Sequence, residues 1–304
     1  MLTRTAVPRG LAAGTALLVL GATAACGDSA AGSSGADGTV PVVTAFYPLQ
    51  FISERIGGDA VTVTNLTKPG TEPHDLELSP RQVGDISDAK LVIYLKGFQP
   101  EVDKAVEQEA HDRAFDVSTV APLQPLSARA DNGALDPHVW LDPSRLATIA
   151  DRLAARLGEA DATHAADYTA RARTLRSELD TLDAEYAEAL ATCRRREIVT
   201  SHSAFNYLAT RYHLTQVGIT GIEPESEPSA QRLADAAAEA RRTGATTIFF
   251  ETLVSPKVAD TIAREVGAKT AGLDPLEGLT QPGGDYLSVM RTNLTALTAA
   301  LGCS

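Results

Sequence analysis

Three of the six histidines in this 304-residue chain lie in loops where they could hold a metal ion. His74 and His138 each follow a proline, and His202 comes just after the predicted strand 197–200. In open α/β sheets, ligands bind beyond the carboxyl ends of strands, where loops distant in sequence converge. Imidazole suits borderline ions such as Zn²⁺. Residue type and placement therefore indicate three candidate ligands, although a lone histidine is more often a surface or hydrogen-bonded residue. We expect the others at the surface, namely His111, His164 and His213.

Strands and helices are predicted to alternate in two separate stretches of the chain, which is typical of parallel α/β sheets. The predicted strands are 40–46, 61–66, 91–95, 197–200, 217–221, 246–250 and 269–273. Between the two stretches, residues 161–191 contain no Gly or Pro and predict one helix about 45 Å long. We therefore predict an α/β fold of two lobes with parallel sheets joined by a single long helix. The expected parts are an N-terminal lobe (40–160), a linking helix (161–192) and a C-terminal lobe (193–304).

The first 25 residues have the pattern of an export signal. Arg4 and Arg9 precede an apolar run that is too short for a membrane-spanning helix. The run ends at Thr23-Ala24-Ala25-Cys26, which resembles the lipobox of bacterial lipoproteins, although Thr23 stands where Leu is usual. We predict a signal peptide (1–25), a lipidated Cys26 and a flexible tether (26–39). Plain secretion is the alternative. The protein would then be extracytoplasmic and anchored to the cell membrane.

Charge and cysteine content agree with export and exclude one class of partner. The formal net charge of −12 leaves no general basic surface for nucleic acid. With Cys26 assigned to lipid, Cys193 and Cys303 remain. Outside the cytoplasm such a pair favours a disulfide, with two buried thiols as the alternative.

Three ordered motifs resemble the signatures of one receptor family. They are Glu72-Pro73-His74-Asp75, Asp136-Pro137-His138-Val139-Trp140-Leu141-Asp142-Pro143 and Ser201-His202-Ser203-Ala204-Phe205. They are similar to those of the cluster A-I metal-binding receptors of ABC importers, the zinc-uptake and TroA-like family. The resemblance runs from about residue 40 to 301. It implies two α/β lobes joined by a long helix, with the metal in the cleft between them. It also implies a monomeric receptor that passes its ion to a membrane permease with a cytoplasmic ATPase.

The resemblance also implies a ligand set. His74 and His138 would be ligands from the N-terminal lobe, and His202 would come from the C-terminal lobe. The fourth family ligand is a carboxylate after the last strand, where we favour Asp274 over Glu277 or a water. Three histidines and one oxygen suit tetrahedral Zn²⁺, whereas manganese-specific relatives typically carry Glu at the position of His202. We therefore predict a zinc receptor, with a manganese or iron receptor as the alternative within the family.

Two alternatives come from other classes of protein. A zinc hydrolase also uses three histidines and a water, and Glu251 or Glu72 could be its base. The sequence has no HExxH pair, so we predict that the protein is not an enzyme. We interpret Glu251 as support for a ligand histidine. A surface adhesin, a role of some relatives, would need an exposed patch that the sequence does not define.

Overall fold

The computed structural model describes residues 38–126, 134–279 and 284–304. The predicted signal peptide, Cys26 and nearly all of the predicted tether lie outside the described residues. Among the residues that are described, no helix combines the length and apolar character needed to cross a membrane.

The N-terminal half (residues 38–160) contains a four-stranded parallel sheet in the order β2-β1-β3-β4. Its strands are β1 (Val40–Thr44), β2 (Val61–Asn65), β3 (Leu91–Tyr94) and β4 (Ala114–Asp116). The helices that follow the first three strands are α1 (Tyr47–Gly57), α2 (Pro80–Asp88) and α3 (Pro100–Glu109). α2 starts at a capping box, in which the side chains of Ser79 and Gln82 each bond the other's backbone N–H. The three strands expected here are confirmed, and β4 is an additional short strand.

The C-terminal half (residues 193–304) repeats this plan with the strand order β10-β9-β7-β8, again all parallel. Its strands are β7 (Glu197–Thr200), β8 (Thr215–Gly218), β9 (Thr247–Phe250) and β10 (Lys269–Gly272). Its helices are α6 (Asn206–Arg211), α7 (Ala230–Thr243), α8 (Lys257–Val266) and α9 (Tyr286–Leu301). A two-stranded antiparallel ribbon, β5 (Gln124–Pro125) with β6 (Leu135–Asp136), stands apart from both sheets and directly precedes His138.

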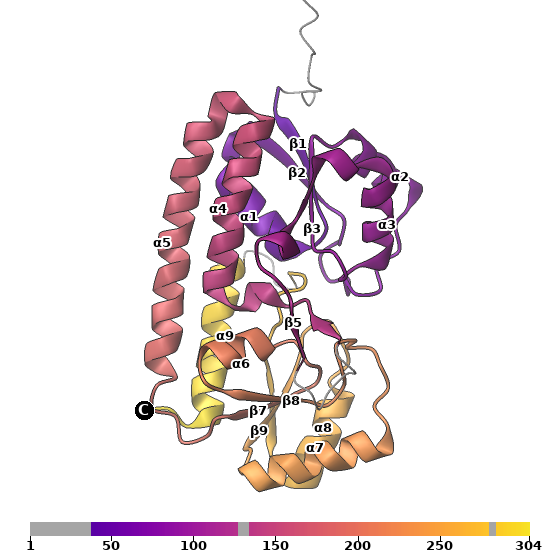
Figure 1. Ribbon diagram of the computed structural model, residues 1–304. Helices are drawn as coiled ribbons and strands as arrows, with labels where there is room; N and C mark the ends of the chain where they lie inside the picture. Colours follow the sequence, from indigo (N-terminus) through magenta and orange to yellow (C-terminus); the bar gives the residue numbers. More distant parts are fainter. Residues whose placement is uncertain (1–37, 127–133, 280–283) are drawn as a thin grey trace, which may run out of the picture. The chain divides into compact units, whose positions relative to one another are not determined.

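Two long helices connect the halves. α4 (Pro143–Ala160) is followed, after a short 3-10 turn, by α5 (Ala165–Ala189). Figure 1 shows α5 running beside α1 and α4 at its first end and beside α9 at its last end, and these helices are in contact. Its buried side chains recur every three or four residues, as an amphipathic helix requires; they are Tyr168, Ala172, Leu175, Leu179, Leu182 and Tyr186. The predicted long helix is confirmed, with slightly shorter bounds.

One continuous hydrophobic core runs through both halves along α5. The ring of Phe51 on α1 stacks on Tyr286 of α9 with centroids 5.4 Å apart. The Tyr186 hydroxyl donates to the Met290 carbonyl oxygen at 2.6 Å. A second, alanine-rich core lies between α7, α8 and the C-terminal sheet. Wide separation of the halves would expose part of the shared core, and each Å² of apolar surface exposed costs about 25 cal/mol. The packing therefore opposes a large hinge motion.

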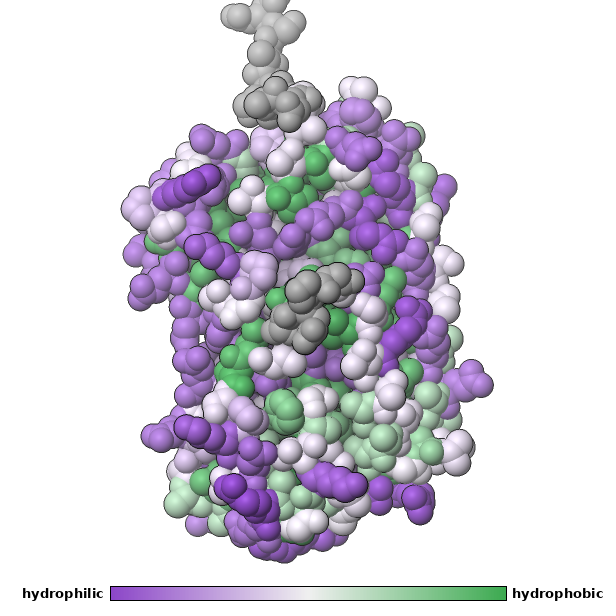
Figure 2. Space-filling model, turned by 180° about the vertical axis from the view of Figure 1, so that it is seen from behind, coloured by the Kyte–Doolittle hydropathy of each residue, from purple (hydrophilic) through white to green (hydrophobic). Residues whose placement is uncertain are grey.

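The surface mixes polar and apolar residues. Seen from behind, its hydrophobic areas are broken up by hydrophilic side chains (Figure 2). Among the described residues, Leu135 on β6 is the one large hydrophobic side chain that is exposed, at 52%.

A disulfide joins Cys193, just after α5, to Cys303, just after α9. We expect replacement of both cysteines by serine to lower the free energy of unfolding by about 2–5 kcal/mol, because the bond closes a loop over 110 positions of the unfolded chain. Denaturant titration of the two proteins measures this difference. Reduction of the unaltered protein should reproduce it, and an unchanged free energy of unfolding would contradict a stabilising role.

Candidate metal centre

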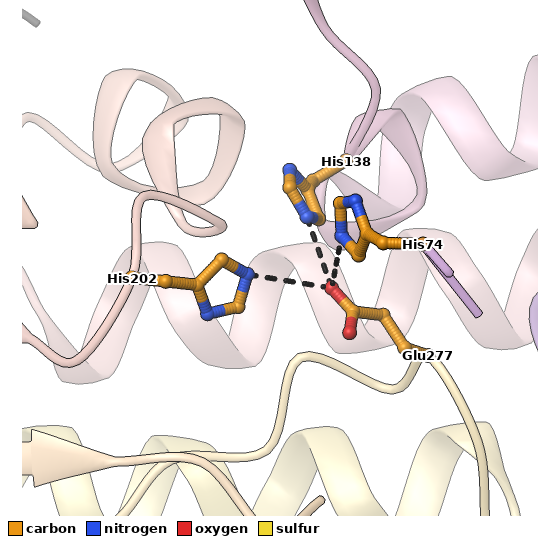
Figure 3. A group of neighbouring side chains, drawn as sticks. All are labelled: His74, His138, His202 and Glu277. Atoms are coloured by element: carbon orange, nitrogen blue, oxygen red, sulfur yellow. Dashed lines mark hydrogen bonds and ion pairs between the residues drawn. The ribbon is translucent and has the colours of Figure 1, made fainter. Parts of the chain in front are cut away.

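Four buried side chains meet at one point, where they could hold a metal ion. His74, His138, His202 and Glu277 each offer one ligand atom, and these atoms all lie within 4.8 Å of one another. The Oε1 atom of Glu277 is 3.5 Å from His74 Nε2, 3.0 Å from His138 Nε2 and 3.4 Å from His202 Nε2. Figure 3 shows the three rings directed at this oxygen. The first two histidines belong to the N-terminal half, and His202 and Glu277 belong to the C-terminal half.

The backbone of each histidine is fixed by the side chain two positions before it. The His74 amide donates to Glu72 Oε1 at 3.0 Å, and the His138 amide donates to Asp136 Oδ1 at 3.0 Å. The His202 carbonyl accepts a hydrogen bond of 2.6 Å from the Thr200 hydroxyl. Local contacts thus fix the backbone position from which each imidazole projects.

A carboxylate faces the Nδ1 atom of each imidazole. Asp136 Oδ1 is 2.7 Å from His138 Nδ1, and Glu251 Oε2 is 2.7 Å from His202 Nδ1. Glu223 Oε2 is 3.6 Å from His74 Nδ1. A carboxylate that accepts a hydrogen bond from Nδ1–H fixes the tautomer of the imidazole and leaves Nε2 free for a metal.

Two nitrogen atoms aimed at the centre lack hydrogen-bond partners among the described residues. They are His74 Nε2 and His202 Nε2. Buried polar atoms in folded proteins are nearly always paired, so unpaired ones require an explanation. A cation at the common point would bond to these donor atoms.

The structure brings Glu277 to the three histidines, and not Asp274, which the sequence favoured. Asp274 holds the loop instead: its carboxylate accepts bonds from the Leu276 amide at 2.8 Å and from the Thr252 hydroxyl at 3.0 Å. The Asn293 side chain bonds both the amide and the carbonyl of Asp274, at 2.9 and 2.7 Å. Leu276 has a φ of 60°, the left-handed region that non-glycine residues rarely adopt. The chain turns at Leu276 and directs Glu277 inwards.

Aromatic side chains form one wall of the centre. The Phe98 ring meets His74 edge-on at 4.7 Å, and Trp140 lies 5.2 Å from His138. The Trp140 indole also donates to the Pro275 carbonyl at 2.7 Å, which ties the His138 segment to the loop of Glu277. Water is excluded on this side, so charges interact more strongly here than at the surface.

The charges at the centre shift the pKa values of its members. Burial raises the pKa of Glu277, but its close contacts with the three histidines outweigh this and hold the pKa well below its ordinary value of 4.5. Burial lowers the pKa of His74, yet Glu223 and Glu277 raise it to about 9. For His202, burial is outweighed by Glu251 and Glu277, which raise the pKa to about 10. Burial and the nearby charge of Glu277 raise the pKa of Glu72 to about 8. Without a metal, protons occupy the centre.

The other acids and histidines considered from the sequence lie beside the centre or away from it. Glu251 Oε2 lies 2.7 Å from His202 Nδ1, and the Glu72 carboxylate accepts a hydrogen bond from the His74 amide. His111 and His213 are exposed, whereas His164 is partly buried and bonds Asp161. Sequence reasoning did not single out Asp136 or Glu223. Asp136 could have been found from its place two residues before a candidate ligand, as Glu72 stands before His74.

Comparison with known proteins agrees with this fold. A family model described as the zinc-uptake complex component A, periplasmic, matches residues 42–300. The chain belongs to this family.

Individual relatives extend the comparison. The high-affinity zinc uptake system protein ZnuA of Bacillus subtilis is 35% identical over 298 residues, covering 91% of this chain and 93% of that protein. The zinc-binding protein AdcA of Streptococcus pyogenes is 36% identical over 288 residues, which is 86% of this chain and 56% of AdcA. This chain thus spans little more than half of AdcA. Zn(II)-bound AdcA of Streptococcus pneumoniae superimposes with a TM-score of 0.76 at 34% identity, covering 87% of this chain and 58% of that one.

Proposed function

We propose that this protein is an extracytoplasmic receptor that binds one Zn²⁺ through His74, His138, His202 and Glu277 and delivers it to an ABC permease with a cytoplasmic ATPase. One observation carries the proposal: three Nε2 atoms and one carboxylate oxygen converge in a buried centre. Membership of a zinc-uptake family supports it. The description of that family as periplasmic supports the location outside the membrane.

The donor set favours Zn²⁺ among divalent metals. Three imidazole nitrogens and one carboxylate oxygen suit a tetrahedral zinc ion, with Zn–N distances near 2.0–2.1 Å. Mn²⁺ prefers oxygen ligands, and the three histidines provide none. Manganese or iron transport is therefore the weaker alternative.

The arrangement favours binding over catalysis. A catalytic zinc site has three protein ligands and leaves its fourth position to water or substrate. Here Glu277 would fill the fourth position, because its carboxylate lies beside all three imidazoles. The two carboxylates that could serve as a base are engaged elsewhere, since Glu251 faces His202 Nδ1 and Glu72 accepts from the His74 amide. We therefore do not assign a hydrolase activity.

The shared core along α5 bears on how the ion is released. Because wide opening is opposed, we infer that release proceeds through small movements of the ligand loops. We further propose that the protein acts as a monomer tethered to the membrane by lipid on Cys26. Replacing Cys26 with serine should move the protein from the membrane fraction to the soluble fraction. Retention in the membrane fraction would contradict the anchor.

Calorimetric titration of the metal-free protein tests the zinc assignment. We expect one tightly bound Zn²⁺ per chain and much weaker binding of Mn²⁺. Tight binding of Mn²⁺ with weak binding of Zn²⁺ would overturn the proposal.

The single tryptophan of the chain should report the binding. Trp140 lies 5.2 Å from the ring of His138, so replacement of protons by Zn²⁺ changes its surroundings. We expect its fluorescence to change on zinc titration and to level off at one equivalent. In Trp140→Phe the signal should vanish while calorimetry still detects zinc. Zinc binding with unaltered tryptophan emission would argue against this location.

A further inference from the structure

The carboxylate that faces His74 differs from the other two Nδ1 partners. The side chains of Asp136 and Glu251 are 0% and 1% exposed, and each belongs to the same half of the protein as its histidine. The side chain of Glu223 is 58% exposed. It also comes from the opposite half, in the segment 221–229 of the loop between β8 and α7. His74 is thus the one ligand whose Nδ1 partner lies across the interface and in contact with solvent.

Little else on the C-terminal side sets the orientation of the His74 ring. The ring packs edge-on against Phe98, and Glu277 Oε1 lies 3.5 Å from its Nε2. The Glu72 carboxylate bonds the backbone of His74 and not its ring. When Nε2 binds a metal, the ring proton sits on Nδ1, and Glu223 is the acceptor that faces it.

The Glu223 side chain can move away from His74 without disturbing the hydrophobic core. Glu223 lies next to the buried Pro224, in a turn where the Ser226 amide donates to the Glu223 carbonyl at 3.3 Å. The carboxylate itself is largely in solvent, so a change of rotamer or a small shift of the loop breaks the contact. Moving Asp136 or Glu251 would instead require repacking of buried side chains.

We propose that the contact between Glu223 and His74 Nδ1, here called the latch, sets the rate of zinc release. While the Glu223 carboxylate stays close to His74 Nδ1, 3.6 Å away, the ring keeps Nε2 directed at the ion. When the segment 221–229 moves away, His74 is the first ligand to dissociate. This inference rests on the proposed zinc-binding function and assigns a positioning role to a residue outside the ligand set.

The zinc dissociation rate, measured by stopped-flow mixing with excess chelator, tests the latch. We expect Glu223→Ala to raise the rate about 10-fold or more, the lower end of the effect of removing a group that orients a metal ligand. Glu223→Gln should raise it less, because an amide oxygen can also face Nδ1–H as an acceptor. The matched control is Glu225→Gln, which changes a second exposed acid of the same loop and should leave the rate within about twofold.

Two further measurements separate the latch from a general effect of the loop. The zinc-free variants should still unfold in one cooperative thermal transition with a midpoint within a few degrees of the unaltered protein, since only a largely exposed side chain and its ion pair with His74 are removed. In a His74→Ala background, Glu223→Ala should change the rate by less than about twofold, because its partner is already gone. An unchanged rate in Glu223→Ala, or equal acceleration by Glu225→Gln, would overturn the latch. Failure of the unaltered protein to bind zinc would instead overturn the proposed function.

Discussion

Replacement of Glu277 by alanine should weaken zinc binding by at least about 100-fold, which exceeds the usual effect of losing a group that only orients a ligand. The variant loses the one oxygen that lies within 3.5 Å of all three Nε2 atoms. It also loses the buried negative charge beside the three imidazoles. Three imidazoles and a water would still bind zinc, so we expect weaker binding and not its abolition.

Asp274→Ala is the matched comparison, because it removes a carboxylate from the same loop. Asp274 accepts bonds from Thr252 and Leu276, so its loss loosens the turn that carries Glu277. We expect zinc binding to weaken by less than about 10-fold, an effect on orientation alone. Competition against a chelator of known affinity measures both variants. A larger loss in Asp274→Ala than in Glu277→Ala would return Asp274 to the ligand set.

Zinc affinity should increase steeply with pH through the neutral range. Without metal, the pKa of His74 is about 9 and that of His202 is about 10, so both imidazoles hold protons at pH 7. Zinc binds the neutral imidazole, so each ion should displace about two protons. Zinc affinity should therefore rise about 100-fold per pH unit below pH 9. Calorimetry in buffers of different ionisation enthalpy counts these protons. A count near zero at pH 7 would contradict the account.

The same pKa values predict how stability depends on pH. His74 and His202 have folded-state pKa values above the ordinary 6.5. Their contribution to the stability of the metal-free protein is therefore complete below about pH 6.5 and is lost as pH rises through about 9–10. The zinc-bound protein, in which the imidazoles of His74 and His202 are neutral, should not show this loss of stability. The difference in thermal midpoint between the two forms should widen from pH 6.5 to pH 9. A constant difference would argue against protonated histidines.

The sequence pointed to the three histidines of the candidate centre more readily than to its carboxylate. His74, His138 and His202 are recognisable because local motifs surround them, and local hydrogen bonds fix each one. Glu277 depends on the left-handed conformation of Leu276 and on the bonds that hold Asp274 to Asn293 and Thr252. Leucine seldom adopts that conformation, and the contacts with Asn293 and Thr252 are distant in sequence. The sequence pattern could not separate two acids three positions apart.

The carboxylates that face the Nδ1 atoms also differ in whether nearby sequence reveals them. Asp136 lies two residues before His138, so its role could be read locally. Glu223 contacts a histidine about 150 positions away, across the interface between the halves, and its contact exists only in the folded protein. Short elements were missed for another reason: β4 has only three residues, too few for an alternating pattern to appear.

X-ray diffraction from zinc-loaded crystals at the zinc absorption edge tests most directly whether His74, His138, His202 and Glu277 bind the ion. We expect one anomalous peak per chain, about 2.0–2.1 Å from the Nε2 atoms of the three histidines and about 2.0–2.2 Å from a carboxylate oxygen of Glu277. A peak away from these four residues, or bound through Asp274 with Glu277 turned aside, would contradict the account.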